Sequence, residues 1–329
     1  MTFKFNNVYI NETATITGPY ESNGPLGKYF DLCHKDLYFG ENNWEEAEEH
    51  LINEAIDTLV RKSKVEINSV DAFIGGDLLN QIVASNYAMM KFNKSFIGIY
   101  AACSTSTLGL ILGSALIDGG FLNKVITFTS SHNTAAEKQY RYPVEYGGPK
   151  PKTTTFTSTG GVAALLSKET GNIKIESGTI GAVIDSGVKD VFNMGAVMAK
   201  AAADTIYKHL QDTGRDISYY DLVLTGDLGV YGKEVLKEYM LSEYNIKLKN
   251  YNDTGVMLYD RENQPVYAGA SGPACAPLVT YGYIFDKMRK GKYKKVLLAA
   301  TGALMSPTMV NHKLSIPATC HAVSLEVIS

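Results

Sequence analysis

The sequence predicts an α/β fold in which helices cover both faces of a largely parallel sheet. Apolar strand-like runs alternate with helix-like runs through the first 130 residues, and the alternation returns after residue 196. This pattern is typical of βαβ units, whose helices pack on both faces of a parallel sheet. The chain has 329 residues and is 45% hydrophobic, which is enough for one large core or two smaller ones.

The first half contains the clearest helix of the sequence, at residues 42–64. Asn42 or Asn43 can cap it, glutamates fill its first turns, and basic side chains fill its last turn, which complements the helix dipole. Apolar runs then predict strands at 71–75, 95–102 and 124–130, with helices at 81–92 and 105–118 between them.

The second half repeats this order, with helices at 196–210, 232–244 and 276–289 and strands at 221–226 and 295–300. Two strings align by eye, Gly120-Phe-Leu-Asn-Lys-Val125 and Gly291-Lys-Tyr-Lys-Lys-Val296, and each joins a helix to an apolar strand. The same offset places Cys103 opposite Ala274. We therefore predict a duplication, with an N-terminal half of residues 1–170 and a C-terminal half of residues 171–329.

Residues 131–155 differ from the rest of the chain, because they are polar and rich in Tyr, Pro, Gly and Lys. A connection of this length in a compact α/β protein is often functional. We predict a long loop here, and a hairpin or surface insertion at residues 250–268.

Composition excludes several classes of protein. The net charge is -3, so no basic footprint predicts a nucleic-acid partner. No run approaches the roughly 20 apolar residues of a membrane span, and the first residues do not resemble a signal peptide. We expect synthesis in the cytosol, with any membrane association being peripheral. The four cysteines are widely spaced, which predicts neither a disulfide framework nor a metal site.

Cys103 is the residue with the strongest chemical signal. An apolar strand ends there, and Ser104 and Thr105 begin the next predicted helix. The N-terminus of a helix favours a thiolate or a bound anion. The alternative is a buried structural cysteine followed by two capping residues.

A strand-end cysteine before a helix, in a duplicated αβ chain, resembles the thiolases and ketoacyl synthases. Several longer strings resemble the stage V sporulation protein AD family of spore-forming bacteria, and they extend from the first third of the chain to its end. The resemblance implies two similar αβα halves with mixed five-stranded sheets, forming one layered α/β/α/β/α body. The strings include Ala101-Ala-Cys-Ser-Thr-Ser106, Thr129-Ser-Ser-His-Asn133, Asn193-Met-Gly-Ala-Val-Met-Ala199 and Thr301-Gly-Ala-Leu-Met-Ser-Pro-Thr308.

The condensing enzymes of this fold pair the cysteine with His and Asn, or with two His. Here the second-half strand runs into Gly226-Asp227 without a His, and the turn that begins at Gly269 carries no Asn. We therefore predict no catalytic residues and no cofactor, with Cys103 as the marker of a binding site. An active acyltransferase that uses Cys103 is the alternative, and a structural subunit with a vestigial pocket is a third interpretation.

The resemblance implies that the ligand is dipicolinic acid, a pyridine ring with two carboxylates, with calcium co-binding left open. Such a dianion calls for cations, an aromatic face and helix-terminal N–H groups. Tyr140 and Tyr142 supply aromatic rings. For Lys138 and Arg141 the alternative is a solvated loop face that pairs with Glu137 and Glu145. The predicted ligand-binding residues are Cys103, Ser104, His132, Asn133, Lys138, Arg141 and Ser271, and no metal site is predicted.

The resemblance also implies a biological setting. It predicts a role in dipicolinate uptake into the developing spore, and in its release during germination, together with the membrane proteins of the SpoVA system. The expected location is peripheral, on the spore inner membrane. A homodimer is expected, because thiolase-fold proteins commonly pair through their central sheets.

Overall fold

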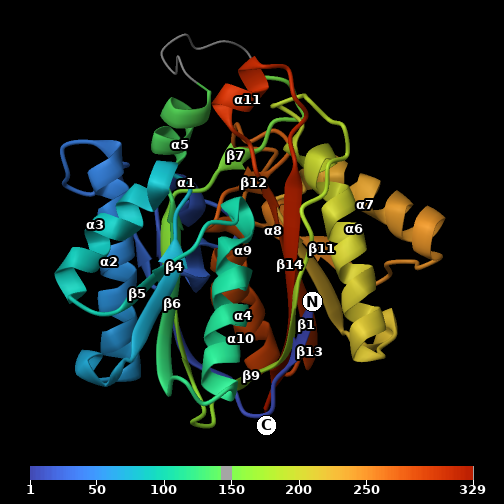
Figure 1. Ribbon diagram of the computed structural model, residues 1–329. Helices are drawn as coiled ribbons and strands as arrows, with labels where there is room; N and C mark the ends of the chain where they lie inside the picture. The colour runs from blue at the N-terminus through green and yellow to red at the C-terminus, as the bar shows by residue number, and fades with distance from the viewer. Residues whose placement is uncertain (142–149, 329) are drawn as a thin grey trace.

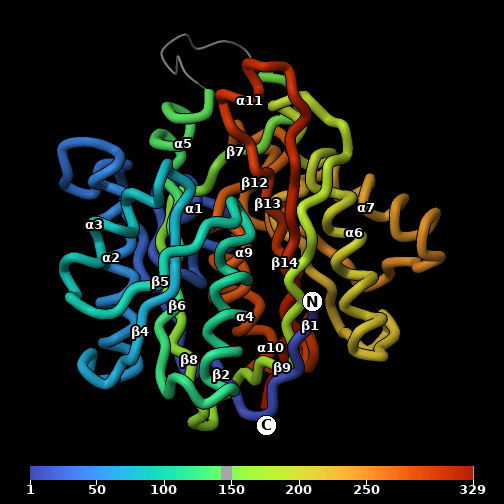
Figure 2. The backbone as a smooth tube through the Cα atoms, viewed as in Figure 1, coloured from blue at the N-terminus to red at the C-terminus, as the bar shows by residue number. Residues whose placement is uncertain are grey.

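The structure is a computed structural model that describes residues 1–141 and 150–328. Five layers lie side by side in Figure 1: outer helices, strands, central helices, strands, and outer helices again. Figure 2 shows the first half of the chain on one side of the central helices and the second half on the other. The predicted layered α/β/α/β/α body is confirmed.

The strands form two sets with the same arrangement. In each set the first three strands are parallel and the last two are antiparallel to their neighbours. The first set is β5 (Phe96–Gly98), β4 (Ala72–Gly76), β6 (Lys124–Ser131), β8 (Gly160–Ser167) and β2 (Tyr9–Thr17). The second set is β11 (Tyr251–Asp253), β10 (Leu222–Gly226), β13 (Lys295–Ala303), β14 (Ala318–Val327) and β9 (Ile173–Ile180).

The two five-stranded sets join into one sheet where β2 pairs with β9, at Tyr9–Lys174 and Ile10–Ile173. Two short strands extend this sheet, β1 (Thr2–Lys4) beside β9 and β3 (Leu32–Cys33) beside β2. Strands β7 (Phe156–Thr157) and β12 (Ala270–Ser271) form a separate parallel pair. The mixed five-stranded sheets expected from the resemblance are therefore confirmed.

The helices fill the other three layers. The outer layers are α2 (Trp44–Ser63) with α3 (Val83–Phe92), and α6 (Met194–Thr213) with α7 (Gly229–Tyr244). The central layer contains α4 (Thr105–Asp118), α9 (Cys275–Pro277), the π-helix η7 (Leu278–Ile284) and α10 (Phe285–Arg289). Short helices are α1 (Pro19–Ser22), α5 (Asn133–Tyr140), α8 (Thr254–Met257) and α11 (Pro307–Asn311). Single 3₁₀ turns are η1 (Gly27–Tyr29), η2 (Ile67–Ser69), η3 (Asn80–Ile82), η4 (Ala102–Ser104) and η6 (Ile217–Tyr219).

Helix α2 forms for the reasons that its sequence predicts. The side chain of Asn43 accepts a hydrogen bond from the N–H of Glu46 at 2.8 Å, which caps the first turn. Leu51, Ile52 and Leu59 are fully buried against the sheet, while Lys64 ends the helix in the left-handed region. Burial of this apolar face stabilises the helix more than its propensity does.

The duplication is visible in the turns that precede β6 and β13. Asp71 accepts hydrogen bonds from the N–H groups of Asn123 and Lys124, and Asp221 accepts them from the N–H groups of Lys294 and Lys295. The glycines of the aligned strings, Gly120 and Gly291, have φ values of 79° and 76°. Two turns with the same φ and the same carboxylate anchor are expected from one ancestral unit. The division of the chain at residue 170 stays a prediction.

Several elements differ from the prediction. The periodicity does not reveal the antiparallel strands β2, β9 and β14, so the sheet is mixed rather than parallel. The strand predicted at 95–102 is short, because the chain turns into η4 before Cys103. The predicted loop at 131–155 begins with helix α5, and Tyr142 lies outside the described residues. Residues 250–268 contain β11 and α8 instead of a hairpin.

Candidate functional site

A cavity lies at the end of the sheet where the parallel strands finish. Leu78 follows β4, Tyr100 and Cys103 follow β5, and Ala303 ends β13, and all four residues line the cavity. Ligands of α/β sheets commonly bind at the carboxyl ends of the strands. The cavity has a volume of about 60 Å³, several times the space that one water molecule needs.

Cys103 reaches the cavity from a tight turn between β5 and α4. The preceding residue, Ala102, has φ 47°, an unusual value for a residue with a Cβ atom. Such backbone strain is often found at functional sites. The turn leaves Cys103 partly exposed at the start of α4, as the sequence predicts.

Beneath Cys103 lies a buried carboxyl group, Asp227, that interacts with the thiols of Cys103 and Cys275. Its Oδ2 accepts a hydrogen bond from the N–H of Gly272 at 2.8 Å. Burial raises the pKa of Asp227 well above its usual range. Burial, and the charge that Asp227 carries when ionised, likewise raise the pKa of the Cys103 thiol well above its usual range. Both shifts disfavour ionisation, and the Cys103 thiol stays protonated at neutral pH.

This arrangement is unfavourable for nucleophilic catalysis. A nucleophilic cysteine needs thiolate character, which a nearby imidazole or cation normally provides. Among the described residues, no histidine lines the cavity. Asp227 was not among the predicted ligand-binding residues. The sequence nevertheless shows it directly after strand β10, at the point where a catalytic His is absent.

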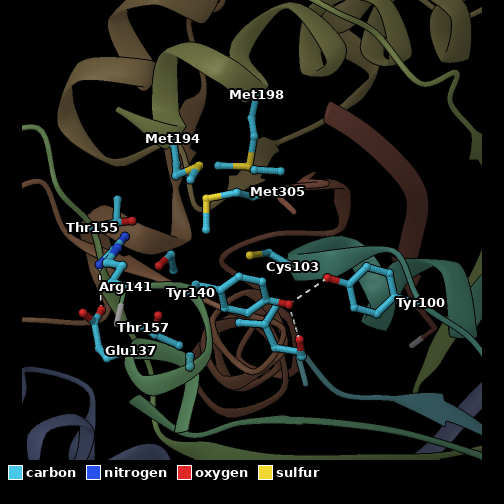
Figure 3. A pocket seen from close by; sticks show the side chains of 14 residues that line it. Tyr100, Cys103, Glu137, Tyr140, Arg141, Thr155, Thr157, Met194, Met198 and Met305 are labelled. Atoms are coloured by element: carbon cyan, nitrogen blue, oxygen red, sulfur yellow. Dashed lines mark hydrogen bonds and ion pairs between the residues drawn. The ribbon is translucent and has the colours of Figure 1, made fainter. Parts of the chain in front are cut away.

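One cation faces the cavity from the end of α5. Arg141 donates a hydrogen bond to Glu137 Oε1 at 2.6 Å, and Lys150 donates one to Glu137 Oε2 at 2.8 Å. Both Arg141 and Glu137 line the cavity (Figure 3). The guanidinium group also lies 5.9 Å from the ring centroid of Phe192. Counting only residues 1–141 and 150–328, two cations and one carboxylate give this group a formal charge of about +1.

An aromatic wall stands on the side of α4. The hydroxyl groups of Tyr100 and Tyr140 are 3.1 Å apart, and the Tyr140 hydroxyl donates to the carbonyl of Leu78. Figure 3 shows both rings beside Cys103. Three flexible thioether side chains, Met194, Met198 and Met305, form the opposite wall. Thioethers make favourable contacts with aromatic rings and adapt to their shape.

Hydroxyl groups complete the lining. Thr157 in β7 and Ser271 in β12 face each other across the two-stranded pair, and Thr155 precedes β7. Thr155 is 2% exposed, and its Oγ1 has no hydrogen-bond partner within the described part of the chain. Buried hydroxyl groups usually have a partner, and the place of Thr155 in the cavity lining makes it a candidate contact for a ligand.

The structure brings three of the predicted ligand-binding residues together, because Cys103, Arg141 and Ser271 line the cavity. The other four use their side chains elsewhere. Ser104 donates to the carbonyl of Ala101, Asn133 donates to the carbonyl of Thr157, and Lys138 pairs with Glu45 at 2.6 Å on the surface.

His132 is buried and serves as the cap of α5. Its Nδ1 accepts a hydrogen bond from the N–H of Ala135, and its Nε2 donates to the carbonyl of Leu37 at 2.8 Å. Burial lowers its pKa, so the ring is neutral with both nitrogens in use. Its ligand contact stays a prediction, without a free ring nitrogen to support it.

Within residues 1–141 and 150–328, no group of three or more His, Cys, Asp or Glu side chains is arranged to hold a metal ion. In the same ranges, no helix is long and apolar enough to cross a bilayer.

Comparisons with known proteins give the same family from sequence. A sequence profile described as "Stage V sporulation protein AD (SpoVAD)" matches residues 1–326. The chain is 42% identical over 320 residues to "Stage V sporulation protein AD" of Bacillus subtilis (strain 168), covering 97% of this chain and 94% of that protein.

Solved structures give the fold. A variant of OleA from Xanthomonas campestris has a TM-score of 0.62 at 12% identity, and the match covers 98% of this chain and 99% of that chain. The 3-oxoacyl-[acyl-carrier-protein] synthase III from Aquifex aeolicus VF5 has a TM-score of 0.55 at 13% identity, with 99% and 100% covered. These similarities confirm the thiolase-like fold.

Proposed function

The chain belongs to the stage V sporulation protein AD family, and from this premise we propose that it binds dipicolinic acid without catalysing a reaction. The ligand enters the proposal through the family, and the cavity supports it chemically. The proposal rests on one combination in a single cavity: the Arg141 cation, an aromatic–thioether slot, and a hydroxyl group that has no partner among the described residues.

Each part of a flat aromatic dicarboxylate has a counterpart in this cavity. The carboxylates pair with Arg141 and with the hydroxyl group of Thr155, since charge-assisted hydrogen bonds are the strongest that a carboxylate forms. The ring lies between Tyr140 and the methionine side chains. The raised pKa of Asp227 disfavours a negative charge beside the dianion.

In the cell this binder would act in dipicolinate uptake into the developing spore and in its release during germination, with the membrane proteins of the SpoVA system as partners. Its place would be peripheral, at the spore inner membrane. We include a homodimer in the proposal, in which two copies pair through the edge of the sheet at β5.

Calorimetric titration with dipicolinate tests the proposal. We expect a dissociation constant between about 1 µM and 1 mM for the unaltered chain. Arg141→Gln should weaken binding at least about tenfold, because a hydrogen bond to a charged group contributes about 1.5–3 kcal/mol. Lys152→Gln, an exposed residue that does not line the cavity, is the matched control. The absence of heat with the unaltered chain would reject dipicolinate as the ligand.

Calcium is tested by repeating the titration with equimolar calcium chloride. Tighter binding of the mixture than of dipicolinate alone would support a chelate as the bound species. Equal binding would assign the affinity to the organic dianion.

An acyltransferase that uses Cys103 is the second candidate, because this cysteine lies at the start of α4 and faces the cavity. Incubation with acyl-CoA thioesters, followed by intact mass measurement, separates the two candidates. We expect no adduct on Cys103, since its thiol is uncharged at neutral pH. A stoichiometric acyl adduct that is absent from Cys103→Ser would establish the enzyme.

A further inference from the structure

The end of the molecule opposite the cavity carries a dense group of cations. Six of the nine residues at 287–295 are Lys or Arg, in a chain whose net charge is -3. They occupy the end of α10, the following turn and the start of β13. Figures 1 and 2 show α10 running toward the end where the C-terminus lies, away from α5 and α11.

Half of these cations have carboxylate partners and half do not. Lys287 and Lys290 both pair with Asp286, and Lys295 pairs with Glu176 and Glu326. The remaining three, Arg289, Lys292 and Lys294, are exposed and form no ion pair with any described residue. We call these three residues the basic turn.

The fold itself does not require this charge, and the duplication provides the comparison. With Gly120 aligned on Gly291, the basic turn corresponds to Asp118, Phe121 and Asn123 in the N-terminal half. That half makes the same turn, with the same positive φ and the same aspartate anchor. A turn that forms equally well without cations indicates that the cations of the second copy serve another purpose.

The surroundings of the basic turn fit an interface between water and lipid. Arg289 and Lys294 border a surface groove of about 480 Å³ whose wall includes Tyr293, Val327 and Ile328. Lys292 lies 5.2 Å from the ring centroid of Tyr293. An amphipathic aromatic ring and apolar side chains among cations are typical of surfaces that contact anionic membranes.

We propose that the basic turn docks this protein on a bilayer that contains anionic phospholipid, with the ligand cavity at the opposite end of the molecule. The cations contact phosphate groups, and Tyr293 lies at the level of the headgroups. This proposal is independent of dipicolinate binding, because none of its residues lines the cavity.

Co-sedimentation with vesicles tests the proposal. The full chain should bind vesicles of phosphatidylcholine with about 30% phosphatidylglycerol and should not bind pure phosphatidylcholine. Binding should fall as salt is raised from about 20 mM to about 300 mM, because exposed charges are then screened. The triple variant Arg289→Gln, Lys292→Gln, Lys294→Asn should bind the anionic vesicles at least about tenfold more weakly, since each surface cation contributes measurably to such binding.

The matched control removes three cations elsewhere, at Lys35→Gln, Lys189→Gln and Lys313→Gln, and so has the same net charge. It should bind like the unaltered chain. All substituted residues are exposed, and unchanged thermal unfolding would show that both variants are folded. The proposal is overturned if the triple variant binds as well as the unaltered chain, or if the control loses as much. Equal binding to both vesicle types, or binding to duplex DNA but not to vesicles, would overturn it too.

Discussion

At the scale of single residues, Asp227 is the ionisable residue that acts on the Cys103 thiol. It places a carboxyl group beside Cys103, directly after strand β10, which ends without a His. An imidazole draws the thiol proton away, whereas a buried carboxylate opposes formation of a second negative charge. We therefore expect Cys103 to be a weak nucleophile.

Replacement of Asp227 by Asn should make Cys103 more reactive. The amide cannot ionise and so does not oppose the thiolate, and alkylation by iodoacetamide at about pH 8 should be severalfold faster. Peptide mass mapping reads the modification at Cys103 separately from exposed Cys33. An unchanged rate would mean that burial alone controls this thiol. Ser106→Ala is a neighbouring control that leaves the carboxyl group in place, because the Ser106 hydroxyl has no hydrogen-bond partner within the described residues.

Glu21 makes stability depend on pH. This fully buried residue accepts hydrogen bonds from the N–H of Thr159 and the hydroxyl of Tyr259, and burial raises its pKa to about 7. Because the folded-state pKa lies above the unfolded value of 4.5, the folded state binds the proton more tightly. The free energy of unfolding should therefore fall between about pH 4.5 and pH 7, by roughly 3 kcal/mol in total, and change no further above that range through this group.

Urea unfolding at a series of pH values measures this slope. The variant Glu21→Gln keeps an acceptor for Thr159 and Tyr259 but does not titrate. Its stability should vary less with pH across the same window. A slope equal to that of the unaltered chain would assign the dependence to other buried acids, such as Asp253, whose pKa burial raises to about 6.

At the scale of elements, the repeated turns give a matched pair for measurement. A methyl group at Gly120 or Gly291 meets no atom within 4 Å, but both residues have positive φ. Alanine at either position should cost about 1 kcal/mol of stability through backbone strain alone. The two losses should add in the double variant, because the turns do not share partners. Denaturant unfolding measures each step, and a loss at one turn only would show that the copies have diverged in conformation.

Elements with strong local signals could be predicted from sequence, and elements made by long-range pairing could not. Helix α2 has a cap, a charge gradient and a buried stripe, so its bounds differ from the prediction by one or two residues. Strand β2 contains Asn11, Glu12 and several threonines, and its partner β8 lies about 150 residues away, so no local pattern marks it. The thiolase-like family resemblance supplied what periodicity lacked.

The residues of the site likewise fall into those that the sequence could identify and those that it could not. Cys103 has a thiol and Arg141 a guanidinium group, so both are recognisable as candidate site residues from the sequence. The fold brings them to one cavity. Thr155, Met194 and Met305 are ordinary residues whose importance depends on where distant elements end, so sequence spacing alone did not identify them. His132 has the right chemistry, but α5 needs it as a cap.

At the scale of the whole molecule, the sheet ends at β5 with one edge unpaired in the described part of the chain. Ile97 in this strand is 39% exposed, and Tyr87 and Met90 on neighbouring α3 are 56% and 68% exposed. An open strand edge beside apolar side chains favours pairing with another strand. We predict that two copies pair edge to edge at β5.

Substitution of Ile97 by Lys should convert dimers to monomers, because a charge would be buried at the new interface. Sedimentation velocity at several concentrations measures the change. Phe121→Lys, at an exposed apolar residue in the turn between α4 and β6, is the control and should leave the association unchanged. A monomeric unaltered chain at all concentrations would contradict the prediction.

The narrow junction between the two strand sets has a consequence for how the protein is made. All five strands of the first set lie within residues 9–167, and β9, the strand of the second set that pairs with β2, ends at Ile180. The first half can therefore complete its own pairing while residues 181–329 are still being synthesised. During this interval the first half would be folded, but its apolar inner helix α4 would not yet be covered by the second half. The nascent protein would therefore need a chaperone most at this stage.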